Sequence, residues 1–137
     1  MEELKNITEE ELTNKLFKHS MWLDTNGEYG IPLDLSNTDL RKINFHGKAL
    51  IKVNFSGANM EGVNLSYTNL SYANFTDTNL KNSDLTGAYL QHSILNNTDL
   101  SNAKVKWADF GFSTIKNCKL TNCNMYDADL RGTDLIK

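Results

Sequence analysis

The sequence contains five thiol and imidazole side chains, which are types that act as nucleophiles, general bases or metal ligands. They are two cysteines, Cys118 and Cys123, and three histidines, His19, His46 and His92. Thiolates and imidazoles ligate zinc, and an imidazole beside Ser and Asp can activate a nucleophile. Either chemistry requires a fold that brings several of these groups together, so the elements that position them must be considered first.

A five-residue repeat dominates the sequence. From Leu35 to Leu135 every fifth residue is apolar, which makes 21 positions, 13 of them Leu. The residue two positions earlier is mostly small, and the residue between them is Asp or Asn in 15 of 21 cases. A period of five fits neither a helix nor a strand. It is satisfied if each unit forms one side of a square coil that closes every 20 residues, with the apolar and small positions pointing inward.

Units such as "ANFTD", "TNLKN", "SDLTG" and "ADLRG" carry a resemblance to a known family. They resemble the pentapeptide repeat family, whose consensus reads A-(D/N)-L-x-x, over residues 33–137. The resemblance implies an all-β solenoid, a right-handed quadrilateral β-helix. The 21 units predict about five coils stacked at roughly 4.8 Å. Asn residues at equivalent positions, such as Asn54 and Asn74 or Asn59 and Asn79, could form amide ladders between coils.

Lys48 breaks the inward pattern, because it stands where a small residue belongs. Its position in the first coil leaves two alternatives open. Its amine could extend over the open end of the coil, or the backbone could bulge locally.

The N-terminal segment predicts a helix over about residues 8–20. Thr8 and Glu11 have the spacing of a capping box. Leu12 and Leu16 lie one turn apart, with Phe17 beside them on one apolar face.

We therefore divide the chain into an N-terminal α-helical cap, residues 1–32, and a β-helix, residues 33–137, within one structural domain. Trp22 and Leu23 are expected to follow the helix and pack over the first coil, and Asn26-Gly27 is typical of a turn. No such segment follows the last repeat. The coil edge near Met125, Leu130 and Leu135 therefore predicts a tail-to-tail homodimer.

The square coil disperses the groups that could do chemistry. Cys118 and Cys123 fall in inward small-residue positions, where they act as small buried hydrophobes. His46 and His92 point outward on different sides, and no Ser, His and Asp converge. We expect no enzyme activity, no cofactor and no metal site.

One side of the coil carries aromatic residues where the other sides are polar. This apolar band could be a protein-interaction patch, or a structural ladder in which aromatic residues stabilise neighbouring coils. Its members are Tyr67, Tyr72, Tyr89, His92, Ile94, Trp107 and Phe112.

Charge limits the functions that fit. Residues 1–32 carry seven acids and three Lys, a net −4, whereas residues 33–137 carry 10 acids and 11 Lys or Arg, a net +1. The best understood members of the resembled family imitate B-form DNA with a negative rod, protect DNA gyrase or topoisomerase IV and so confer quinolone resistance. A nearly neutral body weakens that alternative, and the absence of a basic groove argues against direct nucleic-acid binding.

The leading hypothesis is a non-catalytic module that binds or inhibits a protein partner through the lateral face of a rigid β-helix. The alternatives are the DNA mimic and an inhibitor of a phage or host enzyme. No apolar run approaches a membrane span, and the acidic start is unlike a secretory signal. A cytoplasmic protein without a membrane partner is expected.

Overall fold

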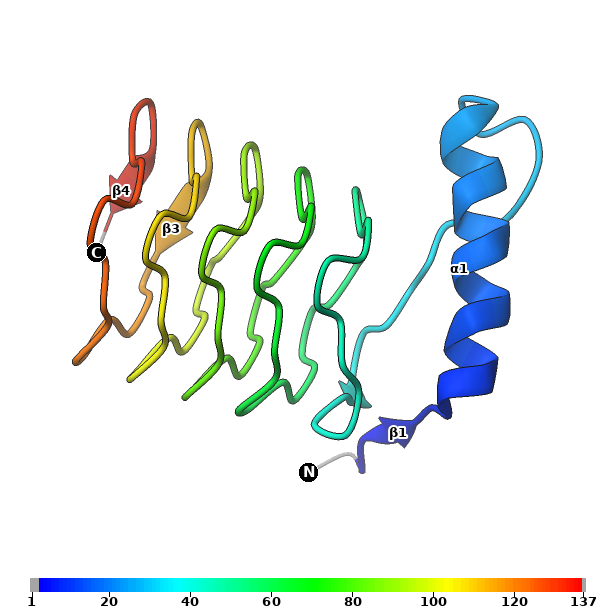
Figure 1. Cartoon of the computed structure of the whole chain (residues 1–137), viewed down its shortest axis with the longest axis horizontal. Coiled ribbons are helices and arrows are strands. Elements are labelled where there is room, and N and C mark those ends of the chain that lie inside the picture. The colour runs from blue at the N-terminus through cyan, green and yellow to red at the C-terminus, as the bar shows by residue number, and fades with distance from the viewer. Residues whose placement is uncertain (1–2, 137) are drawn as a thin grey trace.

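A computed structural model describes residues 3–136 of the chain, with side chains for residues 3–135. The chain winds into a stack of four-sided coils, with one helix at the N-terminal end of the stack (Figure 1). The helices and strands are β1 (Lys5–Asn6), α1 (Glu9–Asp24), β2 (Thr38–Asp39), β3 (Thr114–Lys116) and β4 (Asp134–Ile136). Within residues 3–136, no helix is both long and apolar enough to cross a membrane.

Neighbouring coils are joined by parallel pairing of residues 20 apart. The pairing runs from Asp34 with Asn54 to Asp109 with Asp129, and β3 and β4 continue it in the same register. The amides of the large inward column residues donate to the carbonyl one coil further on, as Leu90 does to Asp109 at 2.6 Å. These bonds confirm the predicted 20-residue coil.

The inward positions form one continuous core. The apolar column residues from Leu35 to Ile115 are at most 5% exposed, and the rings of Phe55 and Phe75 stack 5.0 Å apart. Threonines in the small positions satisfy their hydroxyls by donating to a carbonyl of the preceding coil, as Thr98 does to Phe75 at 2.7 Å. The predicted core is therefore correct in the middle of the rod.

The recurrent Asp and Asn side chains serve the corners rather than the coil-to-coil contacts. Their side-chain oxygen accepts the backbone N–H two residues later, as Asn54 does from Ser56 at 3.0 Å. Among the predicted Asn pairs within residues 3–136, only Asn79 and Asn59 form a hydrogen bond between their side-chain amides, in which Asn79 donates to Asn59 at 3.3 Å. The ladder prediction was therefore wrong for the other pairs, whose side-chain oxygens are bonded within their own corners.

Helix α1 begins after Thr8 as predicted, but it is longer than predicted. The Glu11 amide donates to the Thr8 hydroxyl at 3.1 Å in a capping box. The helix continues to Asp24, so Trp22 and Leu23 lie within it. Leu12 is buried in the core, whereas Phe17 is 68% exposed, so its placement on the apolar face was wrong.

His19 joins α1 to the first coil. Its Nδ1 accepts the Leu33 amide at 2.8 Å, which leaves Nε2 to donate to the Ile51 carbonyl at 2.7 Å. The ring is 1% exposed and stacks on Trp22 at 5.7 Å. On the next side of the coil, β1 pairs with β2 in parallel. The first coil is thus bonded on two sides by the N-terminal segment.

Lys48 does not cause a bulge. Its amide donates to Phe45 at 3.0 Å and its carbonyl accepts from Asn69 at 3.2 Å, as in the regular units. The side chain is partly exposed. The register is therefore kept, and the bulge alternative was wrong.

Candidate interaction face

The aromatic residues gather on one side of the rod, which we call the lateral face. Three outward columns make up this face, and members of a column are 20 residues apart. The Tyr89 column runs along the middle, and the Tyr67 and Tyr72 columns run along the two corners. The columns are Ala49, Asn69, Tyr89, Asp109 and Asp129; Gly47, Tyr67, Gly87, Trp107 and Asp127; and Lys52, Tyr72, His92, Phe112 and Gly132.

Rings of the Tyr72 column stack directly along the rod. Tyr72 and His92 lie 4.8 Å apart at 7°, and His92 and Phe112 lie 5.4 Å apart at 11°. Lys52 lies over the outer face of Tyr72 at 6.0 Å, and Phe112 ends the stack above Gly132. This column therefore has the geometry of a stabilising ladder, with ring edges directed at solvent.

The Tyr67 column is not a continuous stack. The Tyr67 ring lies over Gly87, where an added Cβ would come within 2.5 Å of it. Trp107 lies under the Lys106 amine at 4.1 Å and is 49% exposed. Tyr67 meets the His46 ring of the preceding coil edge-on at 6.1 Å, but no ring contact joins Tyr67 to Trp107 in the part of the chain that the structure describes. A coil-stacking role therefore does not account for both residues.

The aromatic residues of both corner columns have a left-handed backbone. Their φ values lie between 55° and 62°, a region that favours Gly, Asn and Asp. Apart from Lys52, every other residue with positive φ in residues 3–136 is Gly, Asn or Asp. The aromatic side chains are thus confined to two of the four corners, at positions that cost backbone free energy.

Two open grooves lie between the Tyr89 column and the Tyr72 column of the lateral face. The first has a volume of about 440 Å³ and lies between Tyr72, Tyr89 and His92. The second, of about 390 Å³, lies beside Phe112 with Gly111 at its floor.

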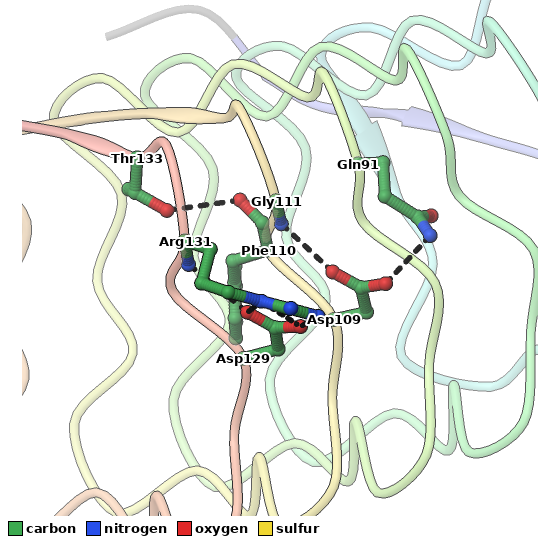
Figure 2. Close-up of polar contacts among 7 residues, drawn as sticks. All are labelled: Gln91, Asp109, Phe110, Gly111, Asp129, Arg131 and Thr133. Carbon is green, nitrogen blue, oxygen red and sulfur yellow. Dashed lines mark hydrogen bonds and ion pairs between the residues drawn. The ribbon is translucent and has the colours of Figure 1, made fainter.

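Figure 2 shows the polar groups of the second groove. Gln91 donates to Asp109 at 2.7 Å, and the Gly111 amide donates to the other Asp109 oxygen at 2.9 Å. Arg131 donates hydrogen bonds to the Asp129 carboxylate from two guanidinium nitrogens, and this hydrogen bonding lowers the pKa of Asp129 to about 2. These carboxylates already have partners, so the groove walls are held in place.

All seven residues of the predicted patch are exposed. Six of them lie on the lateral face. Ile94 lies on the adjacent side, 40% exposed and paired with Asn74 and Thr114. The sequence interpretation overlooked Gln91 and Gly111, which shape the grooves between the columns. Gly111 carried a visible signal, since Ser, Gln and Arg occupy the equivalent positions in the neighbouring coils.

The remaining reactive groups are isolated. Cys118 and Cys123 are free and half-buried, and burial raises the pKa of both thiols, that of Cys123 to about 11. They therefore stay protonated and weakly nucleophilic at neutral pH. Within residues 3–136, no three His, Cys, Asp or Glu side chains converge on a point that could hold a metal ion.

The last coil is more open than the middle of the rod. Met125 and Leu130 are partly buried against the core, and Leu135 is 58% exposed. These are the residues that the sequence interpretation placed at a dimer edge.

The coil geometry agrees with the family match. Residues 32–105 match a family model described as a pentapeptide repeat region, and residues 106–137 match one described as pentapeptide repeats. The chain belongs to the pentapeptide repeat family. A search of curated proteins finds no significant match.

Solved structures share the fold. Rfr23 from the cyanobacterium Cyanothece 51142 is 20% identical, with 90% of this chain and 95% of that chain covered and a TM-score of 0.64. The protein alr5209 from Nostoc PCC 7120 is 17% identical, with 98% and 99% covered and a TM-score of 0.65. A trypsin-treated form of QnrB1, a plasmid-mediated fluoroquinolone resistance protein, is 22% identical, with 76% and 57% covered and a TM-score of 0.52. The fold is thus a right-handed quadrilateral β-helix.

Proposed function

We propose that this protein is a non-catalytic interaction module that binds a protein partner through the lateral face. The rod of about five coils, capped by α1, supplies a rigid support for that face. The observation that carries the proposal is an exposed aromatic surface with an uncharged centre on an otherwise polar rod.

Two segments without any Lys, Arg, Asp or Glu form the middle of this surface. They are residues 62–76 and residues 85–98, and they stack on each other one coil apart. The centres of protein interfaces are depleted in charge and enriched in Tyr and Trp. Most charged groups of the face, among them Lys52 and Asp127, lie toward its ends, as in an interface rim, and Asp109 is hydrogen-bonded to Gln91.

Backbone conformation supports the same reading. An L-residue with a bulky side chain in the left-handed region costs on the order of 1–3 kcal/mol. Ring stacking offsets part of this cost in the Tyr72 column, at about 0.5–1.5 kcal/mol per pair. Tyr67 and Trp107 lack ring stacking along their column, so a role at the surface better explains their presence.

Substitution of Tyr89 tests the proposal with little risk to the fold. Most units have Asp or Asn at the equivalent position, so Tyr89→Asp restores the usual residue of the repeat. We would compare the wild type, Tyr89→Asp/Phe112→Asp and a control, Asn59→Asp on the opposite side, which keeps the acceptor oxygen of Asn59, as baits in a bacterial lysate. Partners captured by wild type and control should be lost with the double variant. Equal recovery by all three baits would show that the aromatic band is structural.

A DNA mimic that protects gyrase or topoisomerase IV is the second candidate. It rests on the fold shared with QnrB1, and the +1 charge of residues 33–137 weighs against it. Titration of the protein into a gyrase supercoiling assay tests it. An effect at micromolar concentration that Tyr89→Asp leaves unchanged would favour the mimic over the lateral-face proposal.

A further inference from the structure

We infer that the lateral face pairs with the lateral face of a second copy of this chain, with the two rods antiparallel. This inference rests on the proposed function, because it names the partner of the same face. It is argued from the order of residue types along the three columns.

The face is nearly symmetric in residue type about the coil that carries Tyr89. One coil before it lie Tyr67 and Tyr72, and one coil after it lie Trp107 and Phe112. In a two-fold symmetric interface the same patch meets itself. We place the two-fold axis in the plane of the interface, perpendicular to the rods, at the level of Tyr89. The coil of one copy that carries Tyr67 and Tyr72 then faces the coil of the other copy that carries Trp107 and Phe112.

The ends of the face have opposite charge. Two coils before Tyr89, the three columns carry Lys52 and no acid, a net +1. Two coils after it, residues 126–132 carry two Asp and one Arg, a net −1. The salt bridges of residues 3–136 do not include Lys52.

Two rods can pair through the same face with two-fold symmetry in a parallel or an antiparallel orientation, and the distribution of charge favours the antiparallel one. If the axis ran along the rods, the copies would be parallel, and each charged end would face a like-charged end. Asp109 and Asp129 would then each lie opposite their own copies near the axis, and like charges in that position are destabilising. If the axis crosses the rods, the basic end of each copy meets the acidic end of the other.

The exposed aromatic area is sufficient for a weak dimer. Five aromatic side chains of the face are between 49% and 66% exposed. At roughly 200 Å² for each side chain, each offers about 100 Å², so a copy contributes about 500 Å². The total of about 1,000 Å² reaches the lower limit of specific interfaces. We therefore expect a dimer that dissociates on dilution.

Sedimentation of the full chain over a range of concentrations tests the dimer. The wild type should show a reversible monomer–dimer equilibrium. Tyr89→Asp, which places two carboxylates at the axis, should weaken the dimer roughly tenfold or more. Leu135→Asp, at the edge of the last coil, should leave dimerisation unchanged. If Leu135→Asp abolishes the dimer and Tyr89→Asp does not, the C-terminal coil mediates it and the inference is overturned.

Disulfide cross-linking tests the orientation, with wild type as the baseline for Cys118 and Cys123. In the antiparallel dimer Tyr89 faces its own copy, and Asn69 of one copy faces Asp109 of the other. Tyr89→Cys should therefore cross-link with itself, whereas Asn69→Cys and Asp109→Cys should cross-link only when mixed. Self-cross-linking of Asn69→Cys or Asp109→Cys alone would instead indicate parallel rods and overturn the inference.

The experiments can refute the inferred dimer and the proposed function separately. A wild type that stays monomeric at every concentration, while Tyr89→Asp still loses partners from the lysate, would overturn the second copy and leave the proposed function intact. If Tyr89→Asp changes neither dimerisation nor capture, both fail.

Discussion

Replacement of His19 by Phe should detach α1 from the first coil and destabilise the protein. Phe keeps an aromatic ring that can stack on Trp22, although a slightly larger one, and it removes both ring nitrogens. The Leu33 amide and the Ile51 carbonyl, now bonded at 2.8 Å and 2.7 Å, would lose their partners. The substitution therefore isolates the two hydrogen bonds from the packing.

The expected loss follows from the cost of the unpaired groups. Each buried polar group left without a partner costs about 1–3 kcal/mol. Both groups lie near the end of the stack, where water can reach them once the helix shifts, so about 3 kcal/mol in total is a reasonable value. With an m-value of about 2 kcal/mol/M, the midpoint of urea unfolding should fall by about 1.5 M.

Urea unfolding followed by circular dichroism measures this shift, and amide exchange of Leu33 reports the local opening. His46→Phe is the matched control, because His46 is exposed, its ring nitrogen bonds one side chain, Ser66, and Phe retains a ring for the edge-on contact with Tyr67. That variant should stay within about 0.5 kcal/mol of wild type. Equal midpoints for His19→Phe and His46→Phe would refute the assignment of His19 as the link between helix and coil.

Three further outcomes are expected. Gly87→Ala should destabilise the rod by more than Gly62→Ala in thermal unfolding: both positions have positive φ, but only Gly87 lies under a ring, and equal losses would contradict the contact. Trp107→Asn should leave stability unchanged or raise it by up to about 1 kcal/mol while lowering partner capture, since Asn suits the left-handed backbone; a large loss of stability would make the residue structural. The Asp129 carboxyl should titrate near pH 2 by NMR, and Arg131→Gln should return its pKa toward 3.8. Because the folded pKa is lowered, the pair stabilises the protein above the unfolded carboxyl pKa, and this contribution is lost as pH falls toward 2.

Much of the fold could be predicted because every coil repeats the same local choices. The inward columns from Leu35 to Ile115 follow from period alone, since a five-residue unit can bury its apolar residue in only one register. The Thr8 capping box was equally predictable, because it depends on residues three apart. The extent of α1 was not, because the contacts that hold its second half, such as His19 with Ile51, join residues 32 apart.

The sequence predicted which residues belong to the candidate face, but it did not predict how their side chains are arranged on it. Tyr89 stood out because it replaces Asp or Asn, and Tyr72, His92 and Phe112 stood out by their spacing of 20. That their rings stack, while Tyr67 covers Gly87, depends on side-chain rotation about left-handed corners. The wrong placement of Phe17 has a similar origin, because helical spacing alone does not say how far the apolar stripe extends.

The amino-acid sequence by itself determined the coil, its register and which side chains point outward, because these depend on a period that each unit repeats. Only the tertiary structure decided that His19 joins helix to coil and that Tyr67 covers Gly87. It also decided that the aromatic residues occupy positions of positive φ beside two grooves. These features arise where segments one coil or more apart meet, and the geometry of such contacts is set by packing rather than by the order of residues.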